Sequence, residues 1–386
     1  MSQELAYILI TPYTIQKSRT GGVIARLLSR TKLDLVGARM LAPDEKFAND
    51  YADCIRESAS NDKKNIDGVL ADYIKDNFTP FDGKYQRIMM LLFKGENARQ
   101  KIYEVVGKLK PGIRTGETIR DTFSDYVLNH DGSVKYFEPA VIVSPVSDGW
   151  EKKLTLFSEL MNSQPNVITK PLQSGDVADK LSLVIIKPDN WRYPSSRPGN
   201  IIDMLSKTGL RIVGCKLYRM SVEEALEFYG PVKNVLRSKL APIFGSKAKK
   251  ILEKELGIVL NENTSSALSD TVGVEFADDQ FSQIIEFMSG VRPEDCSKDQ
   301  LSAPGKVKCL ILIYQGEDAI DKIRDVLGPT DPSKAPGGTI RREFGTDVMV
   351  NTAHASDSYE NAKREMGIVK IENNNIYDII QKFYHL

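Results

Sequence analysis

Residues Ala6-Tyr7-Ile8-Leu9-Ile10-Thr11-Pro12 have a counterpart in Ser182-Leu183-Val184-Ile185-Ile186-Lys187-Pro188. Each stretch is an apolar run closed by proline, which is typical of a buried strand that ends at a turn. A second pair follows at nearly the same separation, Gly22–Leu28 and Gly199–Leu205, and each of these is followed by a β-branched run. Apolar residues at helical spacing and then a β-branched run predict strand, helix, strand. The chain therefore contains two copies of one unit.

The repeat resumes further along the chain at a larger separation. Leu92–Ala98 matches Ile313–Ala319, and Gly116–Arg120 matches Gly337–Arg341. The separation has grown from 177 (22 to 199) to 221 (92 to 313), so the second copy carries 44 additional residues. We place this insertion near residues 231–280.

Within the insertion the sequence predicts two added helices and then a loop. The helices are expected at roughly 233–241 and 246–256, where apolar and charged residues alternate at helical spacing. The Ser/Asn/Thr-rich stretch Asn261–Ser269 is expected to be the loop.

These patterns predict a domain organisation and a fold class. We expect a first domain over 1–145, a structured linker over 146–178 and a second domain over 179–386. Each copy alternates strands and helices in about the order βαββαβ, with strands too close in sequence for a purely parallel sheet. The prediction is an α+β protein of two tandem ferredoxin-like domains, with antiparallel sheets covered by helices.

Composition excludes several classes of function. Lys plus Arg and Asp plus Glu both number 52, so no net charge draws the chain toward nucleic acid or an anionic membrane. The four cysteines form no CxxC pair, so neither a zinc site nor a disulfide framework is indicated. No apolar run is long enough for a membrane span, and the first residues do not resemble a secretion signal. We expect a cytoplasmic protein.

One of the three histidines, His354, lies in a loop that favours chemistry. It follows the alternating run Asp347–Val350 and precedes Asp357 and Glu360, which are spaced to cap a helix. A histidine between a strand end and a helix start can be exposed and yet held in one orientation. From these residues alone, a surface-loop histidine without a role remains an equal alternative.

Several polar residues of the second copy stand at strand ends and turns. Lys187 ends the apolar run 183–186, where it is either a solvated strand end or an anion ligand. Arg324, Thr330 and Arg341 supply two guanidinium groups and a hydroxyl, which suit phosphate oxygens. Each of these alone is more often a surface ion-pair residue or a turn cap.

The second copy resembles the nucleoside diphosphate kinase family. The resemblance rests on ordered stretches over most of a domain, and they are Leu183–Asp189, Gly199–Ile202, Leu210–Gly214, Gly328–Pro332, Gly337–Arg341 and Asn351–Ser358. It implies a ping-pong reaction in which His354 takes the γ-phosphate of a nucleoside triphosphate and passes it to a nucleoside diphosphate. It also implies that Glu365, eleven residues on, holds the second ring nitrogen of this histidine.

The same resemblance assigns roles to the nucleotide-binding residues. By it, Arg324, Thr330 and Arg341 contact phosphates, Lys187 and Asn351 meet the sugar, Lys187 also reaches the phosphates, Tyr229 supports the site and Phe281 stacks on the base. Mg²⁺ is implied as a cofactor held through the nucleotide phosphates rather than by a protein cluster. Nucleoside triphosphates and diphosphates are the implied partners, and an assembly of identical chains is implied as well.

The first copy lacks most of this set. By the internal alignment Lys187 corresponds to Thr11, Arg324 to Tyr103 and Thr330 to Leu109, whereas Arg120 survives opposite Arg341 and Tyr51 lies near the position of Tyr229. His354 falls on Ser133 if the separation of 221 holds, or on Glu138 if the loop differs in length. We expect a non-catalytic first domain that packs against the second or replaces a subunit contact.

Two departures from the family pattern support an alternative function. Ala355 replaces the glycine that follows the histidine in the family. The insertion falls in the helical hairpin that, in the family, forms the nucleotide cleft. The alternative is a catalytically weak or inactive nucleotide-binding or regulatory protein, in which the inserted helices dock a partner.

Overall fold

The computed structural model describes residues 3–57, 64–110, 115–145, 150–172, 180–373 and 375–384. The ends of the expected linker, 146–149 and 173–179, therefore lie outside the described residues. The chain forms two compact units, and the first comprises residues 1–217 together with 310–386. The second unit comprises residues 218–309. Both expected domains contribute their sheets to the first unit, and the insertion makes up most of the second.

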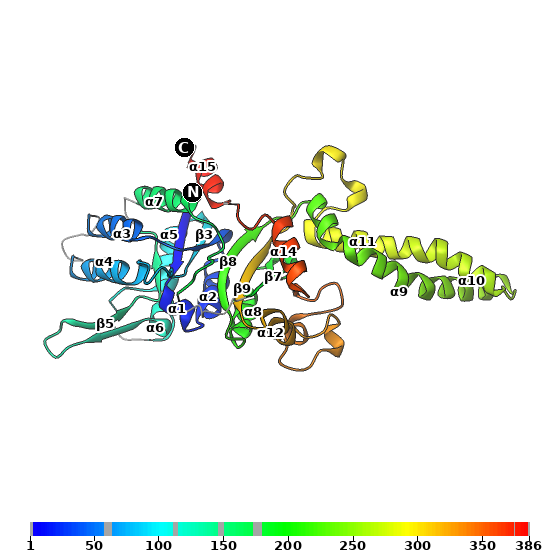
Figure 1. Ribbon diagram of the computed structural model, residues 1–386, viewed down its shortest axis with the longest axis horizontal. Helices are drawn as coiled ribbons and strands as arrows, with labels where there is room; N and C mark the ends of the chain where they lie inside the picture. The colour runs from blue at the N-terminus through cyan, green and yellow to red at the C-terminus, as the bar shows by residue number, and fades with distance from the viewer. Residues whose placement is uncertain are drawn as a thin grey trace. The chain divides into compact units, whose positions relative to one another are not determined.

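The first domain contains one four-stranded sheet, a separate hairpin and the helices that cover the sheet (Figure 1). Its elements are β1 (Gln3–Ile10), α1 (Pro12–Gln16), α2 (Thr20–Thr31), β2 (Asp34–Leu41), α3 (Glu45–Glu57), α4 (Lys64–Phe78), β3 (Ile88–Glu96), α5 (Ala98–Val106), α6 (Ile119–Phe123), β4 (Asp125–Leu128), β5 (Val134–Glu138) and β6 (Val141–Val143). The sheet order is β2-β3-β1-β6, and β1 is antiparallel to both of its neighbours. This is the strand order of a ferredoxin-like βαββαβ fold.

The second domain repeats this topology. Its elements in the first unit are β7 (Lys180–Ile186), the short helix η2 (Pro188–Trp191), α8 (Arg197–Ser206), β8 (Arg211–Tyr218), β9 (Cys309–Gly316), α12 (Ala319–Leu327), η6 (Pro332–Lys334), α13 (Ile340–Phe344), β10 (Ala353–Ala355) and α14 (Tyr359–Ile368). The sheet order is β10-β7-β9-β8, and β7 is antiparallel to β9 and β10. The predicted fold class, two tandem ferredoxin-like domains with antiparallel sheets, is therefore confirmed.

Helices from outside the first domain complete its core. The expected linker contains the helix α7 (Trp150–Ser163), and its Leu154 and Phe157 pack with Tyr7 of β1. The last helix, α15 (Ile376–Tyr384), also packs there through Ile376 and Ile380, although the sequence assigned it to the second domain. Figure 1 shows α3, α4 and α7 side by side on one face of the first sheet. The boundary expected at residue 178 therefore separates the two sequence copies, but it does not separate their hydrophobic cores.

The two domains meet through equivalent helices. A Cβ added to Gly21 of α2 would lie 2.5 Å from the Gly199 carbonyl oxygen, and one added to Gly199 of α8 would overlap the backbone of Gly21 and Ala25. These reciprocal contacts place Gly21 against Gly199 where α2 crosses α8. Two helix backbones approach this closely only where neither residue carries a side chain.

We expect Gly199→Ala to destabilise the chain because the added methyl group has no space at this crossing. Overpacking of this kind costs about 1–3 kcal/mol of unfolding free energy. The matched control is Gly68→Ala in α4, where nothing lies within 4 Å of the added Cβ. That control should be stabilised by about 0.5–1 kcal/mol. Urea unfolding checks both variants, and equal stability of the two would contradict the close crossing.

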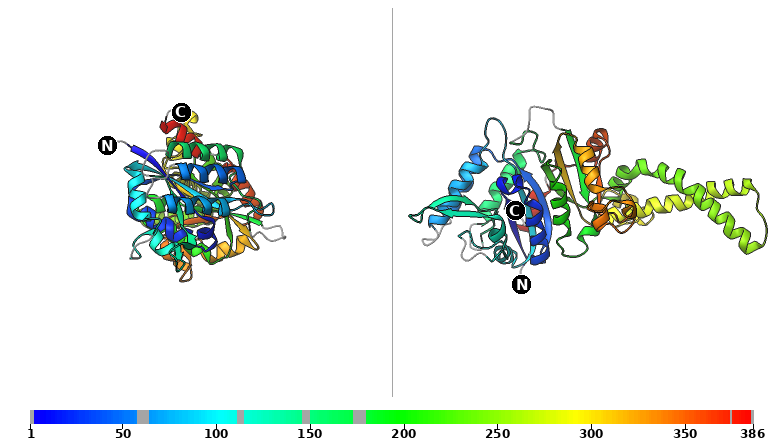
Figure 2. Two further views of the ribbon diagram at one scale, coloured as in Figure 1. Left: turned by 90° about the vertical axis from the view of Figure 1, so that its left-hand side faces the viewer. Right: turned by 90° about the horizontal axis from the view of Figure 1, so that it is seen from below.

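The second unit contains the insertion, whose structure differs from our expectation. Residues 222–256 form one helix, α9 (Val222–Leu256), where two separate helices were expected. The expected loop Asn261–Ser269 is instead the start of a returning helical segment, which runs through α10 (Glu262–Leu268), η3 (Ser269–Gly273) and α11 (Val274–Ser289). The short helices η4 (Pro293–Asp295) and η5 (Lys298–Gln300) follow. Figure 2 shows the hairpin that α9 and α11 form.

Packing explains why the sequence signals failed in the hairpin. Pro231 and Pro242 lie inside α9, yet the helix continues through both of them and packs against the returning helix. Gly245 lies against the backbone of Ser269, and Gly273 lies against the backbone of Ala241, so the two helices pack closely at two levels. Asn261 does not continue a loop but caps α10 by accepting a hydrogen bond from the Thr264 amide.

Candidate functional site

His354 lies in the middle of β10, on the edge strand of the second sheet. Its Nε2 lies 3.1 Å from Oε1 of Glu365 on α14, and the side chain of His354 is 22% exposed. Glu365 is itself buried, and its Oε2 accepts a hydrogen bond of 2.5 Å from the Ser356 hydroxyl. Sequence reasoning missed Ser356, which lies two residues after His354 and directly follows β10.

A strained residue precedes the histidine strand. Thr352 has φ of +76°, a left-handed conformation that β-branched residues rarely adopt. Its hydroxyl accepts a hydrogen bond of 2.9 Å from Arg197, whose guanidinium also pairs with Asp189 at 3.1 Å and reaches the Phe344 carbonyl. Sequence reasoning missed Arg197, whose one signal is its position at the start of α8. Arg197 joins α8, η2 and the histidine loop.

Lys187 and Asn351 lie together. Nζ of Lys187 donates a hydrogen bond of 2.7 Å to Oδ1 of Asn351, and the Asn351 amide donates to the carbonyls of Thr330 and Val348. Lys187 is 8% exposed. Burial, with the nearby positive charge of Arg341, lowers the pKa of Lys187 to about 8. The lysine therefore still carries its charge at neutral pH.

We expect Lys187→Met to raise the unfolding free energy of the ligand-free protein by about 1–3 kcal/mol at pH 7. The lowered pKa means that the buried charge opposes folding at pH values below about 8. As the pH rises from 8 to the ordinary lysine value, the folded wild type loses its proton first and gains stability, so the advantage of the variant should shrink. Urea unfolding at pH 7 and pH 9.5 measures this change.

The matched control for this experiment is Lys363→Met, at an exposed position on α14. Its unfolding free energy should stay within about 0.5 kcal/mol of wild type at both pH values. A loss of stability in Lys187→Met at pH 7 would contradict the proposed cost of the buried charge.

Arg341 joins the histidine strand to the preceding loop. Its two terminal nitrogens donate to the carbonyls of Gly328, at 2.8 Å, and Ala353, at 3.0 Å. Arg324, on α12, and Thr330, in the following turn, are both exposed. Gly328 also closes α12 by donating its amide to the Arg324 carbonyl. The structure therefore groups His354 and Glu365 with Lys187, Asn351 and Arg341, and places Arg324 and Thr330 in the adjoining segment.

The two residues expected on the base side belong to the second unit. Tyr229 lies on α9 and Phe281 on α11, and both are buried within that hairpin. Nζ of Lys233 lies 5.5 Å from the centre of the Phe281 ring. A base that stacks on this face of the ring would have to displace Lys233.

The corresponding region of the first domain lacks the histidine. In the sheet His354 pairs with Ile185, and the equivalent pair of the first domain is Ile142 with Leu9. The expected counterparts, Ser133 and Glu138, are therefore both wrong. They lie next to and within the hairpin of β4 and β5, which the first copy alone carries between its last helix and its edge strand.

The remaining polar groups of that region are occupied. Thr11 donates its hydroxyl proton toward Thr14 or the Ala140 carbonyl, and Glu138 accepts a hydrogen bond of 2.7 Å from Tyr73. Burial raises the pKa of Glu138 to about 7. Arg120 keeps the position of Arg341 and donates to the carbonyls of Gly107, Pro139 and Val141. Arg120 therefore has a structural role that needs no ligand.

Two absences concern the described residues. In this part of the chain, no group of three or more His, Cys, Asp or Glu side chains is placed to hold a metal ion. None of the described helices combines the length and the apolar character needed to cross a bilayer.

Comparisons with known proteins identify the family to which the chain is similar. Residues 298–374 match the family model described as nucleoside diphosphate kinase. The nucleoside diphosphate kinase of Erythrobacter litoralis is 31% identical over 182 residues, covering 47% of this chain and 86% of that protein. That of Anaeromyxobacter dehalogenans is 32% identical over 147 residues, covering 38% and 88%. A solved NDP kinase of Pyrobaculum aerophilum is 26% identical, with a TM-score of 0.34, and covers 51% of this chain and all of that one. The chain belongs to the nucleoside diphosphate kinase family.

Proposed function

We propose that this chain is a nucleoside diphosphate kinase that transfers the γ-phosphate of a nucleoside triphosphate to a nucleoside diphosphate through a phosphohistidine at His354. The observation that carries this proposal is the contact of 3.1 Å between Nε2 of His354 and Oε1 of Glu365. Because a carboxylate can only accept, the ring nitrogen that faces it carries the hydrogen. Nδ1 then keeps its lone pair for attack on phosphorus.

The transfer has two steps that mirror each other. In the first step Nδ1 forms a bond to the γ-phosphorus, the bond from that phosphorus to the bridging oxygen breaks, and the nucleoside diphosphate leaves. In the second step a terminal oxygen of another nucleoside diphosphate attacks the phosphorus, and the phosphorus–nitrogen bond breaks. Glu365 stabilises the positive charge that the ring gains on phosphorylation, and Ser356 holds Glu365 in place.

Phosphoryl transfer depends mainly on positioning and positive charge. Arg324, Thr330 and Arg341 are proposed to contact the phosphates. Lys187 and Asn351, joined by their hydrogen bond, are proposed to meet the sugar, and the lysine also reaches the phosphates. Mg²⁺, held through the nucleotide phosphates, would supply further neutralisation of their charge.

The remaining assignments complete the proposal. Tyr229 would support the nucleotide site from α9 and Phe281 would stack on the base, which suits broad nucleotide use because stacking does not depend on base identity. We further propose that the protein acts in the cytoplasm and assembles with identical chains. The first domain, with Ile142 in place of the histidine, has no catalytic role in this proposal.

The experiment that tests this function follows the phosphoenzyme. The full chain is incubated with γ-labelled ATP and Mg²⁺, freed of nucleotide, and examined for a phosphate bond that acid breaks and base does not. Addition of GDP should then remove the label from the protein and yield labelled GTP. A chain that binds nucleotide but never acquires label would instead be a binding or regulatory protein.

A further inference from the structure

A cavity lies where the two domains of the first unit meet. It measures about 250 Å³. The first domain lines it with Ile15, Gln16, Ser18, Thr20, Gly21 and Arg87, and the second with Ile202, Ser206, Gly209, Leu210, Arg211, Ile212 and Tyr314. Its residues belong to neither the His354 site nor the matching region of the first domain. A volume near 250 Å³ equals about eight waters at about 30 Å³ each, which is enough for a small metabolite.

Positive charge dominates the lining. Arg87 comes directly before β3, and Arg211 opens β8, so each domain contributes one guanidinium group. Among the described residues that line the cavity, none is acidic. Burial and the charge of Arg211 lower the pKa of Arg87 to about 10, so Arg87 is charged at neutral pH. Arg87 is buried and Arg211 is half-buried, and two positive charges at one cavity attract an anion.

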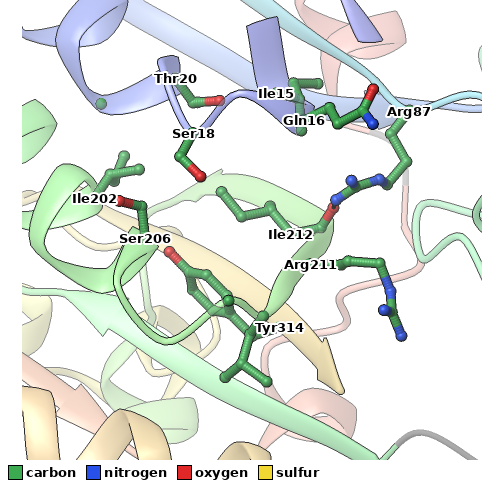
Figure 3. A pocket seen from close by; sticks show the side chains of 13 residues that line it. Ile15, Gln16, Ser18, Thr20, Arg87, Ile202, Ser206, Arg211, Ile212 and Tyr314 are labelled. Carbon is green, nitrogen blue, oxygen red and sulfur yellow. Dashed lines mark hydrogen bonds between the residues drawn. The ribbon is translucent and has the colours of Figure 1, made fainter. Parts of the chain in front are cut away.

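Two buried hydroxyl groups also line the cavity. Tyr314 is 1% exposed and Thr20 is 3% exposed, and within the described residues neither hydroxyl oxygen has a hydrogen-bond partner. A buried hydroxyl without a partner costs free energy, so such groups usually bond to a ligand or to water. In the view of Figure 3, the hydroxyl groups of Tyr314 and Ser206 lie toward one end of the cavity and the guanidinium groups toward the other.

We propose that this cavity binds a small phosphate monoester, with the phosphoryl group at Arg87 and Arg211 and hydroxyl groups of the ligand at Tyr314 and Thr20. A phosphate monoester carries nearly two negative charges at neutral pH, which match the two guanidinium groups. Hydroxyl groups on its carbon chain would satisfy the buried Tyr314 and Thr20 oxygens. Inorganic phosphate carries the same negative charge but has no carbon chain with hydroxyl groups to reach Tyr314 and Thr20.

Binding at this position would stabilise the contact between the domains. Arg87 of the first domain already donates a hydrogen bond of 3.1 Å to the Ile212 carbonyl of the second. A dianion held by Arg87 and Arg211 together would add a second link across the same boundary. Ligand binding should therefore raise the midpoint of thermal unfolding by mass action.

The test is isothermal titration calorimetry of the full chain with ribose 5-phosphate and, separately, with inorganic phosphate. Wild type is compared with Arg211→Met, which removes one charge, and with Tyr314→Phe, which removes only the buried hydroxyl. Arg324→Ala shows whether any signal comes from the proposed nucleotide site instead. Arg56→Gln on α3 is the control for loss of an arginine elsewhere in the first domain.

We expect ribose 5-phosphate to bind wild type with a dissociation constant below about 1 mM. Binding should weaken at least about tenfold in Arg211→Met and in Tyr314→Phe, and stay unchanged in Arg324→Ala and Arg56→Gln. Equal binding of inorganic phosphate and ribose 5-phosphate, with Tyr314→Phe unaffected, would overturn the hydroxyl part of the proposal. Failure of both probes to bind wild type, or loss of binding only in Arg324→Ala, would overturn the site. Neither result affects the proposed kinase activity of His354.

Discussion

His354→Ala should abolish phosphoenzyme formation and lower kcat/KM for phosphoryl transfer by on the order of 10⁴-fold or more. The variant loses the nitrogen that would carry the phosphoryl group, and no neighbouring side chain replaces it. Glu365 and Ser356 would remain bonded to each other, but a carboxylate beside a phosphate repels it. The measurement is retention of label from γ-labelled ATP, together with the rate of transfer to GDP.

His130→Ala is the control for the loss of a histidine. His130 is exposed in the turn between β4 and β5 of the first domain, where no site is proposed. This variant should keep both the label and the rate of wild type. Label retained by His354→Ala would contradict the phosphohistidine, and label lost in both variants would indicate a general loss of folding.

Glu365→Gln separates orientation of the ring from its chemistry. Glutamine has nearly the same shape, but its amide can present either a donor or an acceptor to Nε2, so the tautomer with a free Nδ1 is less favoured. We expect the variant to form the phosphoenzyme more slowly by about 10²-fold while its KM for ATP changes little. Since Glu365 acts through His354, an unchanged rate would remove it from the mechanism as a positioning residue.

The repeat made the fold predictable, because it supplied two independent views of the same strand order. Apolar runs such as Leu183–Ile186 carry the signal for buried strands, and their spacing in both copies excluded a purely parallel sheet. The packing of α15 on the first domain was not predictable. Its contact with Gly37 joins residues that are more than 300 positions apart, and no local pattern encodes such a contact.

Aligning the two copies by a constant separation of 221 residues gave the wrong counterpart of His354, because the first copy has an additional hairpin. The hairpin of β4 and β5 shifts the first copy relative to the second, so Ser133 and Glu138 appeared opposite His354. Sheet register removes this ambiguity. The carbonyls of Ala140 and Thr352 both accept a hydrogen bond from the residue that directly follows the first strand of their copy, and both Ala140 and Thr352 have positive φ. Two residues after Ala140 and Thr352 come Ile142 and His354, so Ile142 is the residue of the first copy that corresponds to His354.

Comparison of the two copies also separates a structural role from a phosphate-binding role for the arginine that both copies keep, Arg120 in the first and Arg341 in the second. Arg120 is 4% exposed and its guanidinium, within the described part of the chain, bonds to backbone carbonyls alone, so its presence in the first domain does not require a phosphate. Arg341 makes the two equivalent bonds, to Gly328 and Ala353. An arginine shared by both copies is therefore weaker evidence for a nucleotide site than Lys187 or His354, which only the second copy has.

Because Arg120 and Arg341 make equivalent bonds, a comparison of their alanine variants measures what Arg341 contributes to activity in addition to stability. Arg120→Ala leaves three buried carbonyls with fewer partners and should lower the unfolding free energy by about 2–4 kcal/mol, with kcat/KM within about threefold of wild type. Arg341→Ala should lower the unfolding free energy by a similar amount. It should also lower kcat/KM by about 10²–10³-fold, because the transferred phosphoryl group loses the positive charge of the guanidinium beside it. Urea unfolding and steady-state kinetics on both variants measure the two effects separately.

The two arginine variants together decide the role of Arg341. Assays are run at 25 °C, at a denaturant concentration of zero, after unfolding curves show that each variant is folded there. If Arg120→Ala loses as much activity as Arg341→Ala, the loss in both arises from weakened strands and Arg341 has no separate role in binding phosphate. If Arg341→Lys restores activity but not stability, the charge acts on the phosphate while the guanidinium fork acts on Gly328 and Ala353, because only the fork reaches both carbonyls.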